Sequence, residues 1–237
     1  MVCFIILHYM VADETIKCVD SILSNVIGDK HILVVDNCSP NGSFEVLRNH
    51  YKDNSVVSVI QNESNNGFAK GNNFGYRYAL EYIHPDYICC MNNDMTIEQK
   101  DFIEQLYLAY DRTHFYVLGP DVYSVSAKIH QNPEHKVLRD YNEVCRQLEY
   151  FKKRGKNTVK FYLKGFLKSI PAVNSLYYKV KDARKHESEE WKEEIIGTAI
   201  HGSCVIFSPD FILERKYAFY PETTFYCEAQ LLDYECH

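Results

Sequence analysis

Short apolar runs alternate with helically spaced apolar residues along the first half of the chain. Runs of this kind are typical of strands covered on both faces, and they lie at 2–7, 31–35, 56–60, 87–91 and 115–118. Helical spacing fills the intervals and predicts helices near 13–23, 43–50, 69–83 and 96–110. Because strand and helix alternate five times, the pattern predicts an α/β domain with a mainly parallel sheet and right-handed crossovers.

Polar residues in front of three of these helices predict N-terminal caps. Asp13 or Thr15 precedes the first helical stripe, Ser43 the second, and Thr96 the last. The oxygen of such a side chain accepts a hydrogen bond from an N–H group in the first turn. The sequence therefore predicts that these residues mark helix starts.

The rhythm changes after residue 120. Residues 135–192 show helical spacing with many Lys and Arg, strand character returns at 199–208, and 225–234 has the pattern of a loop entering a helix. We divide the single domain into an α/β half (1–120), a basic helical insertion (121–198) and a C-terminal segment (199–237). Because no C-cap signal follows the last helix, we expect a truncated C-terminal end.

Charge is uneven along the chain. The net charge of −6 argues against a general nucleic-acid binder. Segment 134–194 holds 15 Lys and Arg against 10 Asp and Glu, a net +5, so the remaining 11 basic and 22 acidic residues give −11. A basic insertion on an acidic body fits contact with anionic lipid headgroups or, alternatively, an ordinary solvated helical surface.

Cysteine usage and the N-terminal residues bear on the compartment. The 9 cysteines include no C-x-x-C pair, and several lie within apolar runs. The opening run at 1–7 lacks a basic region and a cleavage site, and no stretch reaches the ~18 apolar residues of a membrane span. These features favour a reducing cytoplasm.

The first candidate site residue is Asp36, which directly follows a buried run. A carboxylate at the end of a strand can accept a hydrogen bond from N3–H of uracil or thymine. Asn37 and Ser39 lie close enough in sequence to bind ribose or backbone. The alternative is a purely local turn, since Asp-Asn-x-Ser segments often form one.

The second candidate is Asp94, at the end of Asn92-Asn93-Asp94. Mg²⁺ and Mn²⁺ take oxygen ligands and are often bound through one or two carboxylates together with water and substrate phosphates. A carboxylate beside two amides in a tight turn suits that coordination. The alternative is a turn or cap ahead of the following helix.

The third candidate is the loop and helix start at 66–75. Gly67 and Gly71 allow close approach of the backbone to a ligand, and a helix starting near Ala69 directs N–H groups at an anion. Lys70 adds a positive charge. The pattern is neither a P-loop nor a dinucleotide fingerprint, and a Gly-rich loop before an ordinary helix remains the alternative.

Two later segments complete the candidate chemistry. His201-Gly202-Ser203 predicts a closely packed wall or a β-bulge. Glu228 lies in an aromatic and acidic cluster with Tyr226 and Asp233. A carboxylate there suits deprotonation of an acceptor hydroxyl, and a surface helix start is the alternative.

In this order, the segments resemble the inverting family 2 glycosyltransferases of GT-A fold, especially the bacterial rhamnosyltransferase-like branch. N-N-G-F-A-K-G-N-N-F-G at 65–75 is the most specific piece. V-V-D-N-C-S at 34–39 matches the nucleotide-binding Asp segment, and M-N-N-D-M at 91–95 a variant of the D-x-D metal motif. H-G-S-C-V-I-F-S at 201–208 resembles the later acceptor-side strand, and the resemblance covers 2–118 and 202–235.

The resemblance implies transfer of a sugar, with inversion, from a dTDP- or UDP-linked donor to a saccharide or a lipid-linked saccharide in bacterial surface polysaccharide synthesis. It implies a cytoplasmic enzyme, with peripheral contact at the inner membrane. Asp94 would hold Mg²⁺ or Mn²⁺, and Glu228 would be the base. The implied donor-binding residues are Asp36, Asn37, Ser39, Asn66, Gly67, Lys70, Asn73 and Asn93.

The sequence departs from the family pattern in three places. Ala229 stands where an Asp commonly follows the base Glu. Family members usually continue further, often with a His near the metal, and we expect that segment to be missing here. His8-Tyr9-Met10 replaces a common Asn-Tyr or Tyr-Asn pair, a difference that we interpret as minor. Two alternatives to the enzyme are a non-catalytic nucleotide-sugar-binding domain and a sugar nucleotidyltransferase, although the latter usually has a Gly-rich, basic loop after its first strand.

Overall fold

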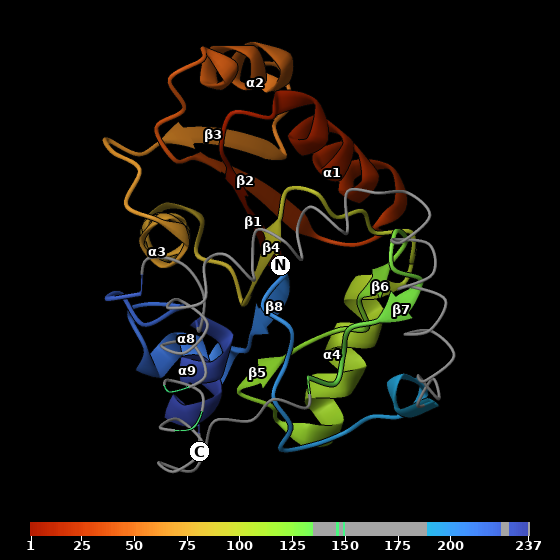
Figure 1. Ribbon diagram of the computed structural model, residues 1–237. Helices are drawn as coiled ribbons and strands as arrows, with labels where there is room; N and C mark the ends of the chain where they lie inside the picture. The colour runs from red at the N-terminus through yellow and green to blue at the C-terminus, as the bar shows by residue number, and fades with distance from the viewer. Residues whose placement is uncertain (135–145, 147–148, 150–188, 224–227, 237) are drawn as a thin grey trace, which may run out of the picture.

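The computed structural model describes residues 1–134, 146, 149, 189–223 and 228–236. Its centre is a sheet of six strands in the order β3-β2-β1-β4-β8-β5 (Figure 1). The strands are β1 (Val2–His8), β2 (Lys30–Asp36), β3 (Val57–Gln61), β4 (Tyr87–Asn92), β5 (Val117–Leu118) and β8 (Cys204–Phe207). The first four are parallel, whereas β8 runs antiparallel to both β4 and β5. The prediction of a mainly parallel sheet is confirmed.

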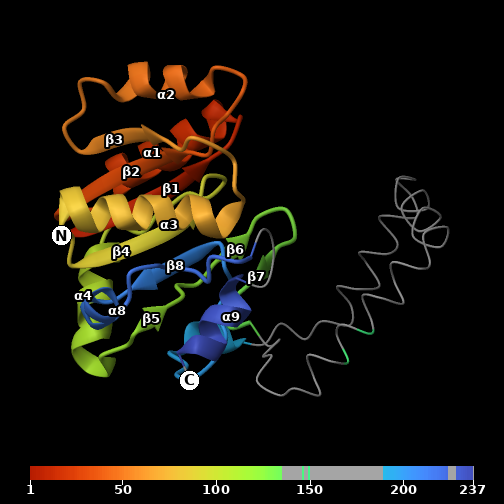
Figure 2. The same cartoon turned by 90° about the vertical axis from the view of Figure 1, so that its left-hand side faces the viewer.

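Helices cover both faces of this sheet. One face packs against α1 (Ala12–Asn25), α2 (Ser43–Tyr51) and α4 (Phe102–Thr113). The other packs against α3 (Phe68–Tyr78) with its π-helical continuation (Ala79–Ile83), α8 (Pro209–Glu214) and α9 (Glu228–Glu235). Figure 2 shows α3 lying over β1 and β2.

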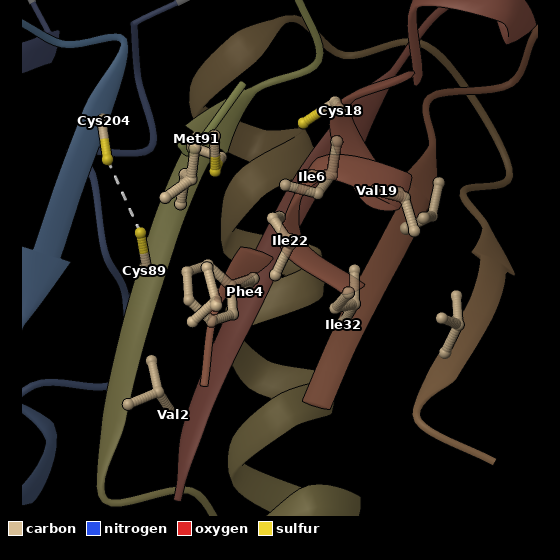
Figure 3. Packing of buried hydrophobic residues seen from close by; sticks show 14 of the residues in the cluster. Val2, Phe4, Ile6, Cys18, Val19, Ile22, Ile32, Cys89, Met91 and Cys204 are labelled. Carbon is tan, nitrogen blue, oxygen red and sulfur yellow. Dashed lines mark hydrogen bonds between the residues drawn. The ribbon is translucent and has the colours of Figure 1, made fainter. Parts of the chain in front are cut away.

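The continuous apolar run of β1 follows from this double cover. Val2, Phe4 and Ile6 point to the core beneath α1, and Cys3 and Ile5 point to the core beneath α3. All five side chains are fully buried. Figure 3 shows the first core, where Cys89 and Cys204 reach across from β4 and β8 with their sulfur atoms 3.6 Å apart.

Several elements differ from those predicted. The segment predicted as a helical insertion opens with a β-hairpin, β6 (Tyr123–Ser124) and β7 (Ile129–His130), and the rest of it lies largely outside the described residues. His130 stacks on Trp191 of a short 3₁₀ helix (Glu189–Lys192). Helix α8 was not predicted, although Ser208 caps it by accepting from the N–H of Phe211.

The three predicted caps are also wrong. Helix α1 begins at Ala12 and α4 at Phe102, and Ser43 is the first residue of α2 rather than its cap. The hydroxyls of Thr15 and Ser43 instead contact the ring of His8, which is buried at the end of β1. The two hydroxyls are therefore hydrogen-bonded to a buried imidazole and not to N–H groups at the helix starts.

The glycines of α3 let this helix lie close to the sheet. A Cβ atom on Gly71 would lie 2.6 Å from a methyl carbon of Leu7. A Cβ atom on Gly75 would lie 2.7 Å from Val35 Cγ2 and 2.9 Å from Ile5 Cγ2. The structure thus gives Gly71 a packing role against β1, where the sequence suggested close approach to a ligand.

We expect Gly75→Ala to lower the free energy of unfolding by about 1–2 kcal/mol. Overpacking a filled core costs about 1–3 kcal/mol, and the gain in helix propensity returns up to about 1 kcal/mol. Urea unfolding measures the difference. Gly202→Ala is the control, because among the described residues its added Cβ would meet only Ala229 Cβ, at an ordinary 3.4 Å. Unchanged or increased stability of Gly75→Ala would show that α3 is free to move outward.

Candidate functional site

The carboxyl ends of β1, β2 and β4 meet at one edge of the sheet. His8 pairs in register with Asp36, and Leu7 pairs with Asn92. Since neighbouring strands lie about 4.8 Å apart, the ends of β2 and β4 are separated by roughly 10 Å. Ligands of open α/β sheets bind outside this edge. The Asp36 segment and the Asn92-Asn93-Asp94 turn therefore flank the same edge, as the sequence predicted.

Asp36 itself is inside the protein. Its exposed fraction is 0%, and its Oδ2 accepts hydrogen bonds from Ser39 N (3.0 Å) and Gln61 Nε2 (2.8 Å). Its Oδ1 has no hydrogen-bond partner among the described residues and lies 3.7 Å from His8 Nε2. In this conformation the carboxylate cannot reach a nucleobase. It fixes the loop after β2 instead.

Asn37 joins the end of β2 to the loop before α3. Its Nδ2 donates to Asn65 Oδ1 (2.9 Å) and to the carbonyl of Gly67 (3.2 Å), and its Oδ1 accepts from Asn62 Nδ2 (3.2 Å). Ser39 performs a similar task on the other side, where its hydroxyl accepts from the N–H of Met10 (2.8 Å). These bonds hold the loop after β2 in place beside the carboxyl ends of the strands.

The start of α3 lies beside Asn37. Gly67 precedes the helix with φ 88°, a left-handed value that favours glycine. Lys70 is exposed in the first turn, and Asn66 is exposed with its amide bonded to Ser64 Oγ (2.6 Å). The positive end of an 11-residue helix and one lysine therefore stand next to the ends of β1 and β2.

Asn73 is buried on the opposite side of α3. Its Oδ1 accepts from the N–H groups of Ala218 and Phe219, both at 2.9 Å, and its Nδ2 donates to the carbonyl of Phe219 (2.6 Å). With an exposed fraction of 1%, the side chain holds the 218–219 segment against α3. Any contribution of Asn73 to donor binding is therefore indirect.

The Asn92-Asn93-Asp94 turn is held from two directions. The N–H of Asn92 donates to the carbonyl of Ser203 (2.8 Å), just before β8 begins. Asn93 Nδ2 donates to Thr15 Oγ1 (3.0 Å) on α1. Asp94 is exposed at the end of the turn. The backbone of Asn92 and the side-chain nitrogen of Asn93 thus hold the turn, and the carboxylate of Asp94 remains accessible.

Glu228 reaches the same region through β8. Gly202 precedes β8, and a Cβ atom on it would touch Ala229 Cβ, the residue after Glu228. Glu228 has an exposed fraction of 7%, and its Oε1 lacks a hydrogen-bond partner in the described part of the chain. Ser203 in turn binds His201 Nδ1 through its hydroxyl (2.7 Å). Contacts along 202–203 therefore connect the Asp94 turn to a buried, unsatisfied carboxylate oxygen.

The sequence profile of Glycosyl transferase family 2 matches residues 3–169. The chain belongs to glycosyltransferase family 2. The matched range contains both Asp segments and the 65–75 motif.

One relative of this family 2 chain is a named hexosyltransferase. Over 118 residues, half of this chain, it is 29% identical to the low-salt glycan biosynthesis hexosyltransferase Agl10 of Haloferax volcanii. That match covers 35% of Agl10, so this chain spans about a third of the length of that relative.

Solved structures of other proteins share its fold. S. aureus TarS (1–349) superposes with a TM-score of 0.56 at 15% identity, covering 98% of this chain and 53% of the TarS chain. The mannosyltransferase PcManGT from Pyrobaculum calidifontis, solved with GDP-Man and Mn²⁺, gives a TM-score of 0.46 at 16% identity over 52% of this chain and 35% of its own. The fold is of GT-A type.

The oxygen atoms of this family 2 site fit a divalent cation that a bound ligand also coordinates. No three His, Cys, Asp or Glu side chains form a metal-sized group within the described ranges. Asp94 offers one carboxylate, which suffices for Mg²⁺ or Mn²⁺ when phosphate oxygens and water supply the rest. Cys18 lies beneath the turn with its thiol 3.7 Å from the carbonyl of Asn92, and burial raises its pKa to about 12.

Sequence reasoning missed the polar residues that organise this family 2 edge. His8 and Gln61 contact Asp36, Thr15 bonds Asn93, and Ser43 bonds His8. Thr15 and Ser43 had been interpreted as helix caps, and His8 and Gln61 had been given no role in the site. A signal was present, because His8 interrupts an apolar run immediately at the end of β1.

None of the described helices is long and apolar enough to cross a membrane.

Proposed function

We propose that this chain is the catalytic domain of an inverting glycosyltransferase that moves a hexosyl or rhamnosyl group from a dTDP- or UDP-linked donor to a hydroxyl acceptor. The observation that carries the proposal is the convergence of three features at one sheet edge of a family 2 domain. They are the Asp36 loop, the start of α3 and the turn bearing Asp94. The relative Agl10, a hexosyltransferase, supports the reaction class.

Donor binding is assigned to the loop after β2 and to the start of α3. Asn37 and Ser39 shape the nucleoside side, and Asp36 holds them from within the core. Asn66, Gly67, Lys70 and the first N–H groups of α3 face the diphosphate, where a helix N-terminus and a lysine stabilise negative charge. Asn73 supports this arrangement from below by anchoring α3.

Asp94 is assigned to Mg²⁺ or Mn²⁺, and Asn93 beside it to donor binding. A cation bound there would neutralise the charge that develops on the departing nucleoside diphosphate. The protein's part is to hold one carboxylate at the strand end, and the bonds of Asn92 and Asn93 do so from both sides.

Glu228 is assigned as the base that takes the proton of the acceptor hydroxyl. Its buried Oε1 has no described hydrogen-bond partner and so keeps an unused acceptor. Attack on the face opposite the leaving group gives inversion. We propose a saccharide or lipid-linked saccharide as acceptor, in synthesis of a surface glycan. The basic 134–194 segment, most of which lies outside the described residues, is the part suited to anionic lipid at the inner membrane.

A second candidate is a nucleotide-sugar-binding domain without transfer activity. Ala229 favours it, because the acid that commonly follows the base is replaced by a methyl group. Both candidates bind donor, and only the enzyme consumes it in the presence of an acceptor. Release of nucleoside diphosphate from labelled donors therefore separates them.

We expect UDP or dTDP to raise the melting temperature of the chain in the presence of Mn²⁺, and to do so much less with EDTA. A ligand at 100 times its Kd stabilises the folded state by about 2.7 kcal/mol. A thermal-shift screen of UDP, dTDP, GDP and ADP with Mn²⁺, Mg²⁺ or EDTA measures this. The absence of any nucleotide-dependent shift would refute the proposed function, and a shift insensitive to EDTA would refute the metal assignment.

A further inference from the structure

His8 occupies the centre of a buried polar cluster behind the site. Its ring is fully buried at the end of β1. Nδ1 lies 2.7 Å from Thr15 Oγ1, and Nε2 lies 2.8 Å from Ser43 Oγ and 3.7 Å from Asp36 Oδ1. One imidazole thereby joins β1, β2, α1 and α2 at the edge where the donor is proposed to bind.

Thr15 extends the cluster to the Asp94 turn. Its single hydroxyl accepts from Asn93 Nδ2 at 3.0 Å and has one proton to donate. The possible acceptors are His8 Nδ1 at 2.7 Å and the carbonyl of Val11 at 3.3 Å. The shorter contact favours His8 Nδ1. The hydrogen bonds then run in one direction, from Asn93 to Thr15 to His8.

This direction fixes the tautomer of His8. If Nδ1 accepts, Nε2 carries the proton and donates to Ser43, with Asp36 Oδ1 on the same side. Burial lowers the pKa of His8, an effect that Asp36 partly offsets, and a neutral ring agrees with an accepting Nδ1. The orientation of Asn93 follows, because an amide whose nitrogen is bound to Thr15 must direct its oxygen to the other side.

We propose that His8 and Thr15 are positioning residues that orient Asn93 and thereby hold the turn that presents Asp94. The effect of these two residues on cation binding rests on the proposed function, whereas their effect on the turn does not. Both side chains are fully buried, so neither residue acts as a catalytic group. They act through a hydrogen bond that spans 78 positions of sequence.

The composition of the cluster supports a role beyond stability. Burying polar groups is unfavourable unless each is hydrogen-bonded, and an aliphatic cluster of equal volume would avoid that cost. Here a buried carboxylate oxygen of Asp36 lacks a described hydrogen-bond partner. A cluster that served stability alone would gain from an apolar group in that position, whereas one that aligns two strand ends has a reason to keep its polar members.

Thr15→Val tests the proposal, because valine keeps the shape of threonine and removes only the hydroxyl. Hydrogen exchange of the amides at 92–96 in the ligand-free chain is the first readout. Loss of one hydrogen bond should raise local exchange about tenfold. The second readout is the Mn²⁺ concentration that half-saturates binding of UDP and of dTDP, which we expect to rise about fivefold to tenfold.

Two variants provide matched controls. Thr15→Ser keeps the hydroxyl and should behave as the wild type in both readouts. Ser43→Ala removes the partner of His8 on the other ring nitrogen, so it should lower stability without changing exchange at 92–96. If Thr15→Val does not fold, His8→Gln replaces it, since one glutamine amide cannot serve both Thr15 and Ser43 in the same geometry.

The outcomes separate this inference from the proposed function. Unchanged exchange at 92–96 in Thr15→Val, or equal changes in Thr15→Val and Ser43→Ala, would overturn the positioning role. If the wild-type chain binds neither UDP nor dTDP with Mn²⁺, the proposed function fails, and the exchange data still decide whether Thr15 holds the turn. A raised Mn²⁺ requirement with restored binding in Thr15→Ser would support both.

Discussion

Asp94→Ala is expected to abolish the Mn²⁺ dependence of nucleoside diphosphate binding and to lower sugar transfer by about 10²–10³-fold. Charge stabilisation by a bound cation is worth several kcal/mol in the transition state, and each 1.36 kcal/mol changes a rate tenfold. Asp94 is the exposed carboxylate of a turn in which the side-chain nitrogen of Asn93 donates to Thr15 and the backbone N–H of Asn92 donates to Ser203. No other side chain of that turn can supply the missing charge.

Calorimetric titration of UDP and dTDP at several Mn²⁺ concentrations measures the binding effect, and release of nucleoside diphosphate measures transfer. Glu98→Ala is the control, because Glu98 is an exposed acid only four positions away. It should leave both quantities unchanged. Binding by Asp94→Ala with the Mn²⁺ dependence of the wild type would show that the metal assignment is incorrect.

Glu228→Gln is expected to lower transfer by about 10²–10⁴-fold while donor binding stays close to that of the wild type. General-base catalysis contributes a factor of that size, and glutamine keeps the shape of glutamate without its basicity. Glu228 begins α9 beside Gly202, whereas the donor side is assigned to the loop after β2 and the start of α3. Its replacement should therefore leave the donor edge intact.

Single-turnover transfer and donor affinity are measured on the same preparation. Glu222→Gln is the matched control, since Glu222 is an exposed acid ahead of α9. A loss of donor affinity in Glu228→Gln would move this residue from the base to the donor site. Transfer at the wild-type rate would remove it from the mechanism altogether.

The strands were predictable because their burial is written in the local sequence. A parallel strand covered on both faces is a continuous apolar run, and β1, β2 and β4 each are. The direction of β8 was not predictable in this way. Its apolar run Cys204–Phe207 would suit either direction, and its pairing with β4 depends on how the chain returns to the sheet.

The position of the site was predictable, but the surroundings of its residues were not. Asp36 and the Asp94 turn fall at one edge because the carboxyl ends of parallel strands do. The burial of Asp36 depends on Gln61 and His8, which come from other strands. Likewise, the hydroxyls of Thr15 and Ser43 had the sequence context of caps, and only the tertiary position of His8 redirects them.

The reversed direction of β8 places two distant segments side by side. Because β8 begins where β4 ends, Ser203 is one hydrogen bond from Asn92 although 111 positions separate them in sequence. The intervening polypeptide adds β5 to the far side of β8 and then returns to the end of β4. Under the proposed function, a change in the length of the chain between β5 and β8 would alter the acceptor side of the site and leave the donor side in place.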